Sequence, residues 1–242
     1  MKLEENALLR HDHLSGEWSD RYYAGRFPRN MDEYDIWKRH RLYLEFLERI
    51  GPLGSALEVG CGTGDNIAKC TAAVRLGIDV SERMIKNAGQ VHKDIEFSVM
   101  DILDGSLTTV YDVVICLGVI QYVSDHRRFL DAVVERVADN GYLVLSFPNK
   151  NSLFRQMHYL GGGTAGKQKD HLKDEICGLL EERGFIAERL RAHSSALPGT
   201  SRLLAPFNLL ATFALDGWYS VIGDGALADR LAYSYLGLFR KS

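Results

Sequence analysis

A short apolar run in this chain leads into a turn with three glycines that alternate with single residues. The run covers residues 56–59, and the glycines are Gly60, Gly62 and Gly64. A second apolar run follows and ends in Asp79. Glycines after a strand let the backbone approach a ligand, and an acidic side chain after the next strand can accept hydrogen bonds from ribose hydroxyls. The spacing therefore predicts a Rossmann-like sheet with a nucleoside pocket at its edge.

The glycine pattern also narrows the class of ligand. A dinucleotide fingerprint reads G-x-G-x-x-G and would need a glycine at position 65, where the chain has Asp65. A phosphate-binding P-loop would need Gly-Lys followed by Ser or Thr, and this turn has no such segment. A tight turn that needs positive φ angles is the alternative explanation for the glycines. The turn favours a nucleoside without phosphates.

Three later segments extend the pattern: Gly-Ile-Asp-Val-Ser at 77–81, Met-Asp at 100–101 and Tyr-Asp-Val-Val-Ile-Cys-Leu at 111–117. In this order, and with Glu58 before the glycines, they resemble the successive motifs of class I S-adenosylmethionine-dependent methyltransferases over roughly residues 35 to 190. The resemblance implies that S-adenosyl-L-methionine is the cofactor, that Asp79 binds its ribose and that Asp101 binds its adenine amino group. It also implies cofactor contacts from Gly60, Cys61, Gly62, Gly64, Val80, Met84, Ile102, Leu117 and Gly118.

Several of these residues have plainer structural explanations. Asp79 could instead be the N-cap of the next helix, although Ser81 fits the N-cap position better. Met84 suits the core as well as an adenine face, and Asp101 suits a solvated turn.

Two residues ahead of the first strand complete the expected cofactor site. Arg39 lies where ubiquinone-type O-methyltransferases, which the chain weakly resembles, bind the carboxylate of the cofactor's methionine. A guanidinium can hold a carboxylate through two parallel hydrogen bonds. Arg41 competes for this role, and an exposed helix arginine is the alternative. Tyr23 is a candidate to cover the cofactor, and packing of the N-terminal segment explains it equally well.

The alternation of elements predicts one α/β domain, a Rossmann-like class I methyltransferase fold with a mostly parallel sheet and helices on both faces. Strands are expected at 56–60, 74–79, 95–99, 111–117, 142–147 and 185–190, and helices at 36–50, 65–72, 82–91, 126–138 and 176–183. The resemblance implies a seventh, antiparallel strand, for which 233–240 is the candidate. We expect an N-terminal cap at 1–35, a cofactor-binding core at 36–150, and substrate-side insertions with the last strands at 151–242.

Composition limits the partners and the compartment. The formal net charge of −3 and the lack of a basic stripe give no footprint for nucleic acid. The four cysteines are widely spaced without a C-x-x-C pair, which is typical of reduced thiols in the cytosol. The first residues lack the basic start and apolar segment of a signal peptide. We therefore expect a cytoplasmic protein.

The acceptor side is predicted from less specific features. Residues 203–215 are almost entirely apolar but shorter than the about 20 residues of a membrane span. A lid, a peripheral membrane or lipid contact through 203–222, and a homodimer contact remain alternatives. The expected acceptor is a small molecule, with an apolar or lipid-like one favoured.

Histidine is the natural base if the acceptor is a hydroxyl, because its pKa lies near neutrality. His171 is the preferred candidate, a cap or surface residue is its alternative, and the other candidates are His126, His158, His193 and Tyr122. The segment 117–122 lacks the carboxylates that metal-assisted members of the family carry, so no metal is expected.

The sequence thus predicts a methyltransferase in which positioning of the acceptor carries most of the catalysis. The alternative function is a non-catalytic S-adenosylmethionine-binding protein that acts as a sensor or an assembly subunit.

Overall fold

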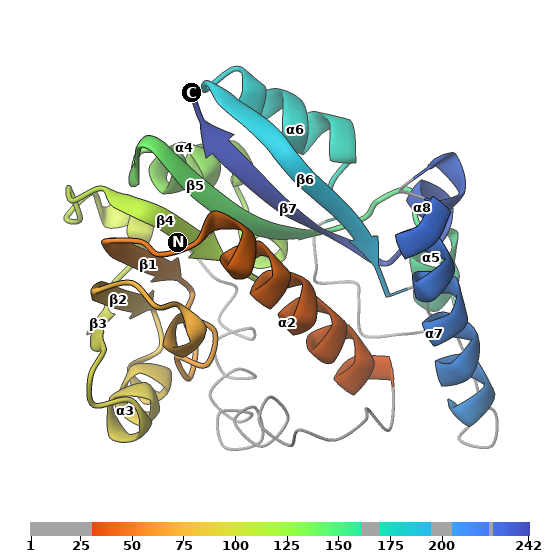
Figure 1. Cartoon of the computed structure of the whole chain (residues 1–242), viewed down its shortest axis with the longest axis horizontal. Helices are drawn as coiled ribbons and strands as arrows, with labels where there is room; N and C mark the ends of the chain where they lie inside the picture. Colours follow the sequence, from red (N-terminus) through yellow and green to blue (C-terminus); the bar gives the residue numbers. More distant parts are fainter. Residues whose placement is uncertain (1–30, 161–169, 195–204, 223–224) are drawn as a thin grey trace.

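A computed structural model describes residues 31–160, 170–194, 205–222 and 225–242, and within them seven strands form one sheet in the order β3-β2-β1-β4-β5-β7-β6 (Figure 1). The strands β1 to β5 pair in parallel, and β7 runs antiparallel between β5 and β6. This confirms the expected fold class and the seventh, antiparallel strand. The strands are β1 Ser55–Val59, β2 Val74–Asp79, β3 Glu96–Val99, β4 Tyr111–Cys116, β5 Val137–Pro148, β6 Phe185–His193 and β7 Ser234–Lys241.

Helices cover both faces of the sheet, as predicted. The α-helices are α2 Met31–Ile50, α3 Glu82–Val91, α4 His126–Val134, α5 Leu153–Leu160, α6 Lys173–Glu181, α7 Ala205–Ile222 and α8 Ala226–Leu231. Short 3-10 helices follow three of the parallel strands: η1 Ile67–Lys69, η2 Ile102–Asp104 and η3 Ile120–Tyr122. Helix α2 crosses one face, and α4 and α6 lie on the other (Figure 1).

The side chains of β4 show how the two layers form. Val113 and Ile115 belong to the cluster that contains Tyr43 of α2, whereas Val114 belongs to the cluster that contains Phe129 of α4. Successive side chains of a strand point to opposite faces, so a continuous apolar run is buried on both sides.

The predicted helix at 65–72 is wrong, because the chain forms only the short η1 there. The N–H of Ile67 donates to the Glu58 carboxylate at 2.9 Å, and the chain is already extended at Cys70, so no α-helix continues from this turn. Helix α4 also ends earlier than the predicted 138, since Val137 pairs with Tyr111 and begins β5.

The N-terminal boundary of the predicted core also shifts. Helix α2 begins at Met31 rather than at residue 36, so the last residues of the predicted 1–35 cap belong to this helix. Residues 1–30 of that cap, with Tyr23, lie outside the described residues.

Glu58 anchors the glycine turn from inside the sheet. Its side chain is only 1% exposed and accepts hydrogen bonds from the Asn66 amide and the Ile67 N–H, both at 2.9 Å. Burial raises its pKa to about 8, against the lowering effect of these hydrogen bonds, and the charges of Asp65 and Asp79 add to the rise. The turn after β1 therefore rests on a buried acid.

This raised pKa predicts how stability changes with pH. The folded protein holds the Glu58 proton between the ordinary pKa of 4.5 and about 8, so the free energy of unfolding should fall as pH rises through this window. In the Glu58→Gln variant the side chain is neutral at every pH, so the decrease in the free energy of unfolding that Glu58 causes should disappear. Denaturant unfolding from about pH 5 to about pH 9 measures it, with the exposed Glu48→Gln as control. Parallel stability curves for wild type and Glu58→Gln would contradict the assignment.

Candidate functional site

The three glycines after β1 all have positive φ angles, of +70°, +54° and +81° for Gly60, Gly62 and Gly64. A Cβ on Gly60 would lie 2.3 Å from Val119 Cγ2, and one on Gly64 would lie 2.6 Å from Phe97 Cζ. A Cβ on Gly62 would meet no atom of the described residues within 4 Å. The tight-turn explanation thus applies to all three glycines, and side chains of the protein also crowd Gly60 and Gly64, whereas the described residues leave space beside Gly62.

The Asp79 carboxylate joins this turn to the end of β2. One oxygen accepts the Gly62 N–H and the other accepts the Ser81 N–H, both at 2.9 Å. Ser81 is the N-cap of α3, because its hydroxyl accepts the Met84 N–H at 3.2 Å. The cap role therefore belongs to Ser81, as the sequence favours. A carboxylate offers about four acceptor positions, which leaves capacity for ribose hydroxyls beside Gly62.

Arg39 reaches the end of β4, and Arg41 does not. Gly118 has φ +75°, and a Cβ there would lie 3.2 Å from Nη1 of Arg39. The exposed Arg41 instead places its guanidinium 5.0 Å from the centre of the Trp37 ring. Of the two arginines that compete from the sequence, Arg39 stands at the carboxyl edge of the parallel strands, where ligands of such sheets bind.

The other expected cofactor residues surround this edge. Asp101 accepts the Leu103 N–H at 3.0 Å and thereby caps η2, a local role like the turn aspartate of the alternative explanation. Val80 is half-buried, and burial raises the pKa of the Cys61 thiol well above its usual value, which keeps it neutral. The buried apolar candidates are Met84, Ile102 and Leu117.

His171 is neither a cap nor a surface residue. Its side chain is 2% exposed, its N–H donates to the Pro148 carbonyl at 3.3 Å, and Leu172 takes the N-cap position of α6. Burial, and then the charge of His126, lower its pKa to about 4. A general base is most effective with a pKa near the working pH, so this environment is unfavourable for that role.

A second histidine, His193, is fully buried at the end of β6. Nδ1 of His193 is 3.4 Å from Oδ1 of Asp35 and 2.9 Å from the Ser194 hydroxyl. Its Nε2 is buried and has no hydrogen-bond partner among the described residues. The sequence offers His193 only as one of several candidates and contains no signal for Asp35, because the two residues meet only in the fold.

This Asp35–His193 pair belongs to a polar cluster that joins α2, α7 and β6. The Tyr34 hydroxyl donates to Asp216 at 2.8 Å, and the Ser194 N–H donates to the same carboxylate at 3.2 Å. Burial would raise the pKa of Asp35, but hydrogen bonding and charge from His193, with the charge of Arg39, hold it below its usual value. The carboxylate is therefore ionised beside the imidazole.

Helix α2 connects the cluster to the cofactor edge. Asp35 and Arg39 are four residues apart, which places their side chains about 5–6 Å apart at Cβ on one helix face. Asp35, which lies beside His193, is thus one helical turn from Arg39, which lies beside Gly118.

Comparisons with known proteins agree with this geometry. The profile of a methyltransferase domain matches residues 31–189. The chain is 28% identical to the mitochondrial ubiquinone biosynthesis O-methyltransferase of Schizosaccharomyces pombe over 153 residues, 56% of each chain. It is 30% identical to the trans-aconitate 2-methyltransferase of Klebsiella pneumoniae over 131 residues, 50% of this chain and 52% of that protein. The chain therefore spans about half the length of the curated relatives it matches.

A solved structure shows the same fold over nearly the whole chain. The N-methyltransferase NodS from Bradyrhizobium japonicum, crystallised with S-adenosyl-L-homocysteine, superposes with a TM-score of 0.63 at 20% identity, covering 98% of this chain and 97% of that one. The profile match covers more than half of the chain and includes the glycine turn, Asp79 and Arg39. The chain belongs to the methyltransferase-domain family, as a class I member of the S-adenosylmethionine-dependent type.

Proposed function

We propose that this protein transfers the methyl group of S-adenosylmethionine to a small-molecule acceptor. The observation that carries the proposal is the meeting of three features at one edge of the sheet: the open side of Gly62, the Asp79 carboxylate and the Arg39 guanidinium. The sulfonium of the cofactor supplies the electrophilic methyl group. What the chain supplies is a rigid seat that holds donor and acceptor in line.

Each expected residue has a role in this proposal. Asp79 accepts hydrogen bonds from the ribose, Arg39 holds the methionine carboxylate, and Asp101 accepts from the adenine amino group. The remaining residues line the seat through backbone or apolar contacts: Gly60, Cys61, Gly64, Val80, Met84, Ile102, Leu117 and Gly118, with Tyr23 as a cover.

The arginine assignment is tested by two variants of the same helix. Arg39→Met removes at least one charged hydrogen bond to the carboxylate, worth about 1.5–3 kcal/mol, so the affinity for S-adenosylhomocysteine should fall by at least roughly 10- to 150-fold. Arg41→Met should leave it unchanged, because Arg41 contacts Trp37 instead. Isothermal titration calorimetry measures both. An equal loss of S-adenosylhomocysteine affinity in the two variants would contradict the assignment of Arg39 to the cofactor site.

Turnover distinguishes the enzyme from a non-catalytic binding protein. A panel of polar and apolar acceptors is incubated with S-adenosylmethionine, and released S-adenosylhomocysteine is measured. A sensor or assembly subunit would bind the cofactor in calorimetry but release no product above the background with any acceptor or with cell extract.

Helix α7 supports an apolar acceptor. Its buried face carries Leu209, Thr212 and Asp216, whereas Phe207 and Leu210 are 73% and 64% exposed. Phe213 and Trp218 also reach solvent, so the outer face of this helix is largely apolar. The relatives include an O- and an N-methyltransferase, so their names do not select the attacking atom.

We infer that this face contacts a lipid surface, from which an apolar acceptor would be taken. Among the described residues, none of the helices has both the length and the apolar character to cross a bilayer. A contact of this kind would therefore be peripheral.

Liposome flotation tests the lipid contact. Wild-type protein should float with the vesicles, and Phe207→Ser combined with Leu210→Ser should leave a larger share in the soluble fraction. Ile186→Ser, at an exposed apolar position of β6, is the control. Equal soluble recovery with and without vesicles would end the proposal, and a wild-type dimer that the double variant loses in sedimentation would assign the face to a second copy.

For a hydroxyl acceptor, we infer that His193 is the base. Asp35 favours the proton on Nδ1, which leaves Nε2 bare to accept the acceptor's proton. The buried Nε2 has no other partner within the described part of the chain. The base role of His171 stays a prediction from the sequence, and the same experiment compares the two.

Matched variants separate the two histidines. His193→Gln should lower kcat by about 10²- to 10⁴-fold and leave S-adenosylhomocysteine affinity intact, because it removes the proton acceptor alone. Asp35→Asn should lower kcat less. Circular-dichroism melting and cofactor affinity check that each variant folds. If His171→Gln loses more turnover than His193→Gln, the sequence prediction is the better one.

A further inference from the structure

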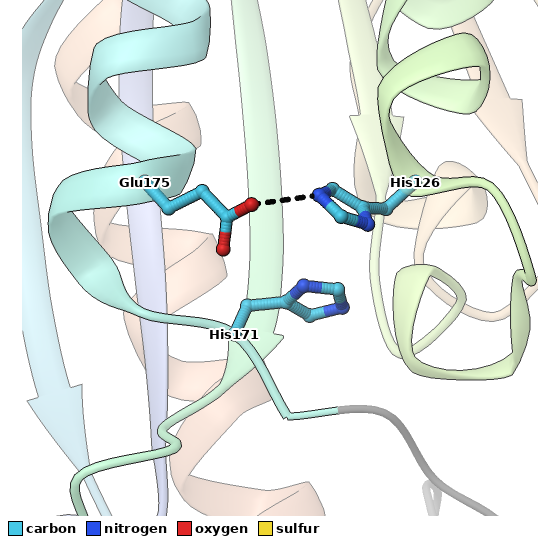
Figure 2. Close-up of side chains that lie close together, drawn as sticks. All are labelled: His126, His171 and Glu175. Carbon is cyan, nitrogen blue, oxygen red and sulfur yellow. Dashed lines mark hydrogen bonds and ion pairs between the residues drawn. The ribbon is translucent and has the colours of Figure 1, made fainter.

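Three side chains converge between the N-terminal ends of α4 and α6 (Figure 2). His126 is the first residue of α4, His171 lies beside the end of β5, and Glu175 lies in the first turn of α6. We propose that they form a binding site for a divalent transition-metal ion, with Zn²⁺ as the ion that the donors suit best.

The spacing of the donor atoms carries the proposal. Nε2 of His126 lies 3.1 Å from Oε1 of Glu175, and the rings of His126 and His171 are 4.9 Å apart at their centres with a T-shaped arrangement. One donor atom from each residue lies within 4.8 Å of the others. Donors bound to zinc at about 2.0–2.2 Å stand roughly 3.4 Å apart in a tetrahedron, so His126 and Glu175 already have this spacing. A ring nitrogen of His171 lies within 4.8 Å of the other two donors and would have to move closer to bind the same ion.

The burial of His171 is the second observation. Its ring is almost fully buried. Figure 2 shows one ring nitrogen of His171, Nδ1, facing the gap between Glu175 and His126, while Nε2 points away from them. A cation bound between the three residues would hold this ring through Nδ1.

The donor set selects the class of ion. Two imidazoles and one carboxylate suit zinc and its transition-metal neighbours, whereas Mg²⁺ and Ca²⁺ take oxygen ligands. The expectation that no metal is present rested on the absence of carboxylates in 117–122, which concerns hard cations and a different place in the fold. Three protein donors would leave a fourth position for water.

Other charged groups near the cluster do not block it. Arg127 approaches Glu175 at 3.9 Å, but its side chain is 60% exposed and can turn into solvent. Asp170 pairs with Arg155 at 2.5 Å, so it is not needed as a donor. A bound ion would replace the arginine as the partner of Glu175 and link α4, α6 and the end of β5.

The test is a metal titration of the full chain after chelator treatment. Co²⁺ serves as the optical probe for the zinc site, and Zn²⁺ is added in competition. We expect one equivalent to produce the visible absorption of a four-coordinate ion and Zn²⁺ to displace it. His126→Gln and Glu175→Gln should each weaken binding more than about 10-fold, since even residues that only support a metal ligand contribute about 10–100-fold. The neighbouring, exposed Asp174→Asn should bind as wild type does.

Two outcomes would overturn the proposal. One is the absence of a stoichiometric ion. The other is unchanged affinity in both His126→Gln and Glu175→Gln. The side chains of His126 and Glu175 are 23% and 34% exposed, so these variants should fold. Calorimetry with S-adenosylhomocysteine on the same samples keeps this result separate from the proposed methyl transfer.

Discussion

The hydrogen bond between the Gly62 N–H and the Asp79 carboxylate is the interaction on which the proposed cofactor site depends. It fixes the turn after β1 against the end of β2, while the second carboxylate oxygen accepts the Ser81 N–H at the start of α3. The buried Glu58 fixes the other end of the same turn by accepting hydrogen bonds from the Asn66 amide and the Ile67 N–H. Two acids on neighbouring strands thus set the backbone around Gly62, where space for a ligand remains.

Helix α2 joins the proposed cofactor site to the proposed acceptor side of the molecule. Its Arg39 stands against Gly118 at the end of β4, and one turn earlier Asp35 faces His193 at the end of β6. Parallel strands end at one edge of the sheet, and a single helix across one face can therefore contribute to both parts of a site. The Tyr34 contact with Asp216 ties α7, with its apolar outer face, into the same arrangement.

The two buried histidines near this edge differ in what surrounds them. Nδ1 of His193 lies 2.9 Å from the Ser194 hydroxyl and 3.4 Å from the Asp35 carboxylate, and its buried Nε2 has no hydrogen-bond partner among the described residues. The proposed role of His193 as a base depends on this arrangement. His171 faces another imidazole, and burial with the charge of His126 lowers its pKa to about 4. This environment disfavours a proton on the ring but suits a neutral ligand of a cation. The same residue type can therefore serve two different chemistries within one fold.

Sequence alone was sufficient for the strand and turn pattern, because apolar runs, glycines and caps act over a few neighbouring residues. The six predicted strands and the Ser81 cap followed from such local signals, whereas the antiparallel β7 was implied by the family resemblance. Sequence alone failed at 65–72, where only η1 forms: the Ile67 N–H donates to the Glu58 carboxylate of β1, and the chain is extended again at Cys70. The pairing of Asp35 with His193 and the meeting of His126 with His171 and Glu175 emerged only in the tertiary structure, which also places Arg39 beside Gly118 and Arg41 beside Trp37. Those contacts join elements far apart in the chain, and no local preference of the backbone encodes which side chains the packing of helices on a sheet brings together.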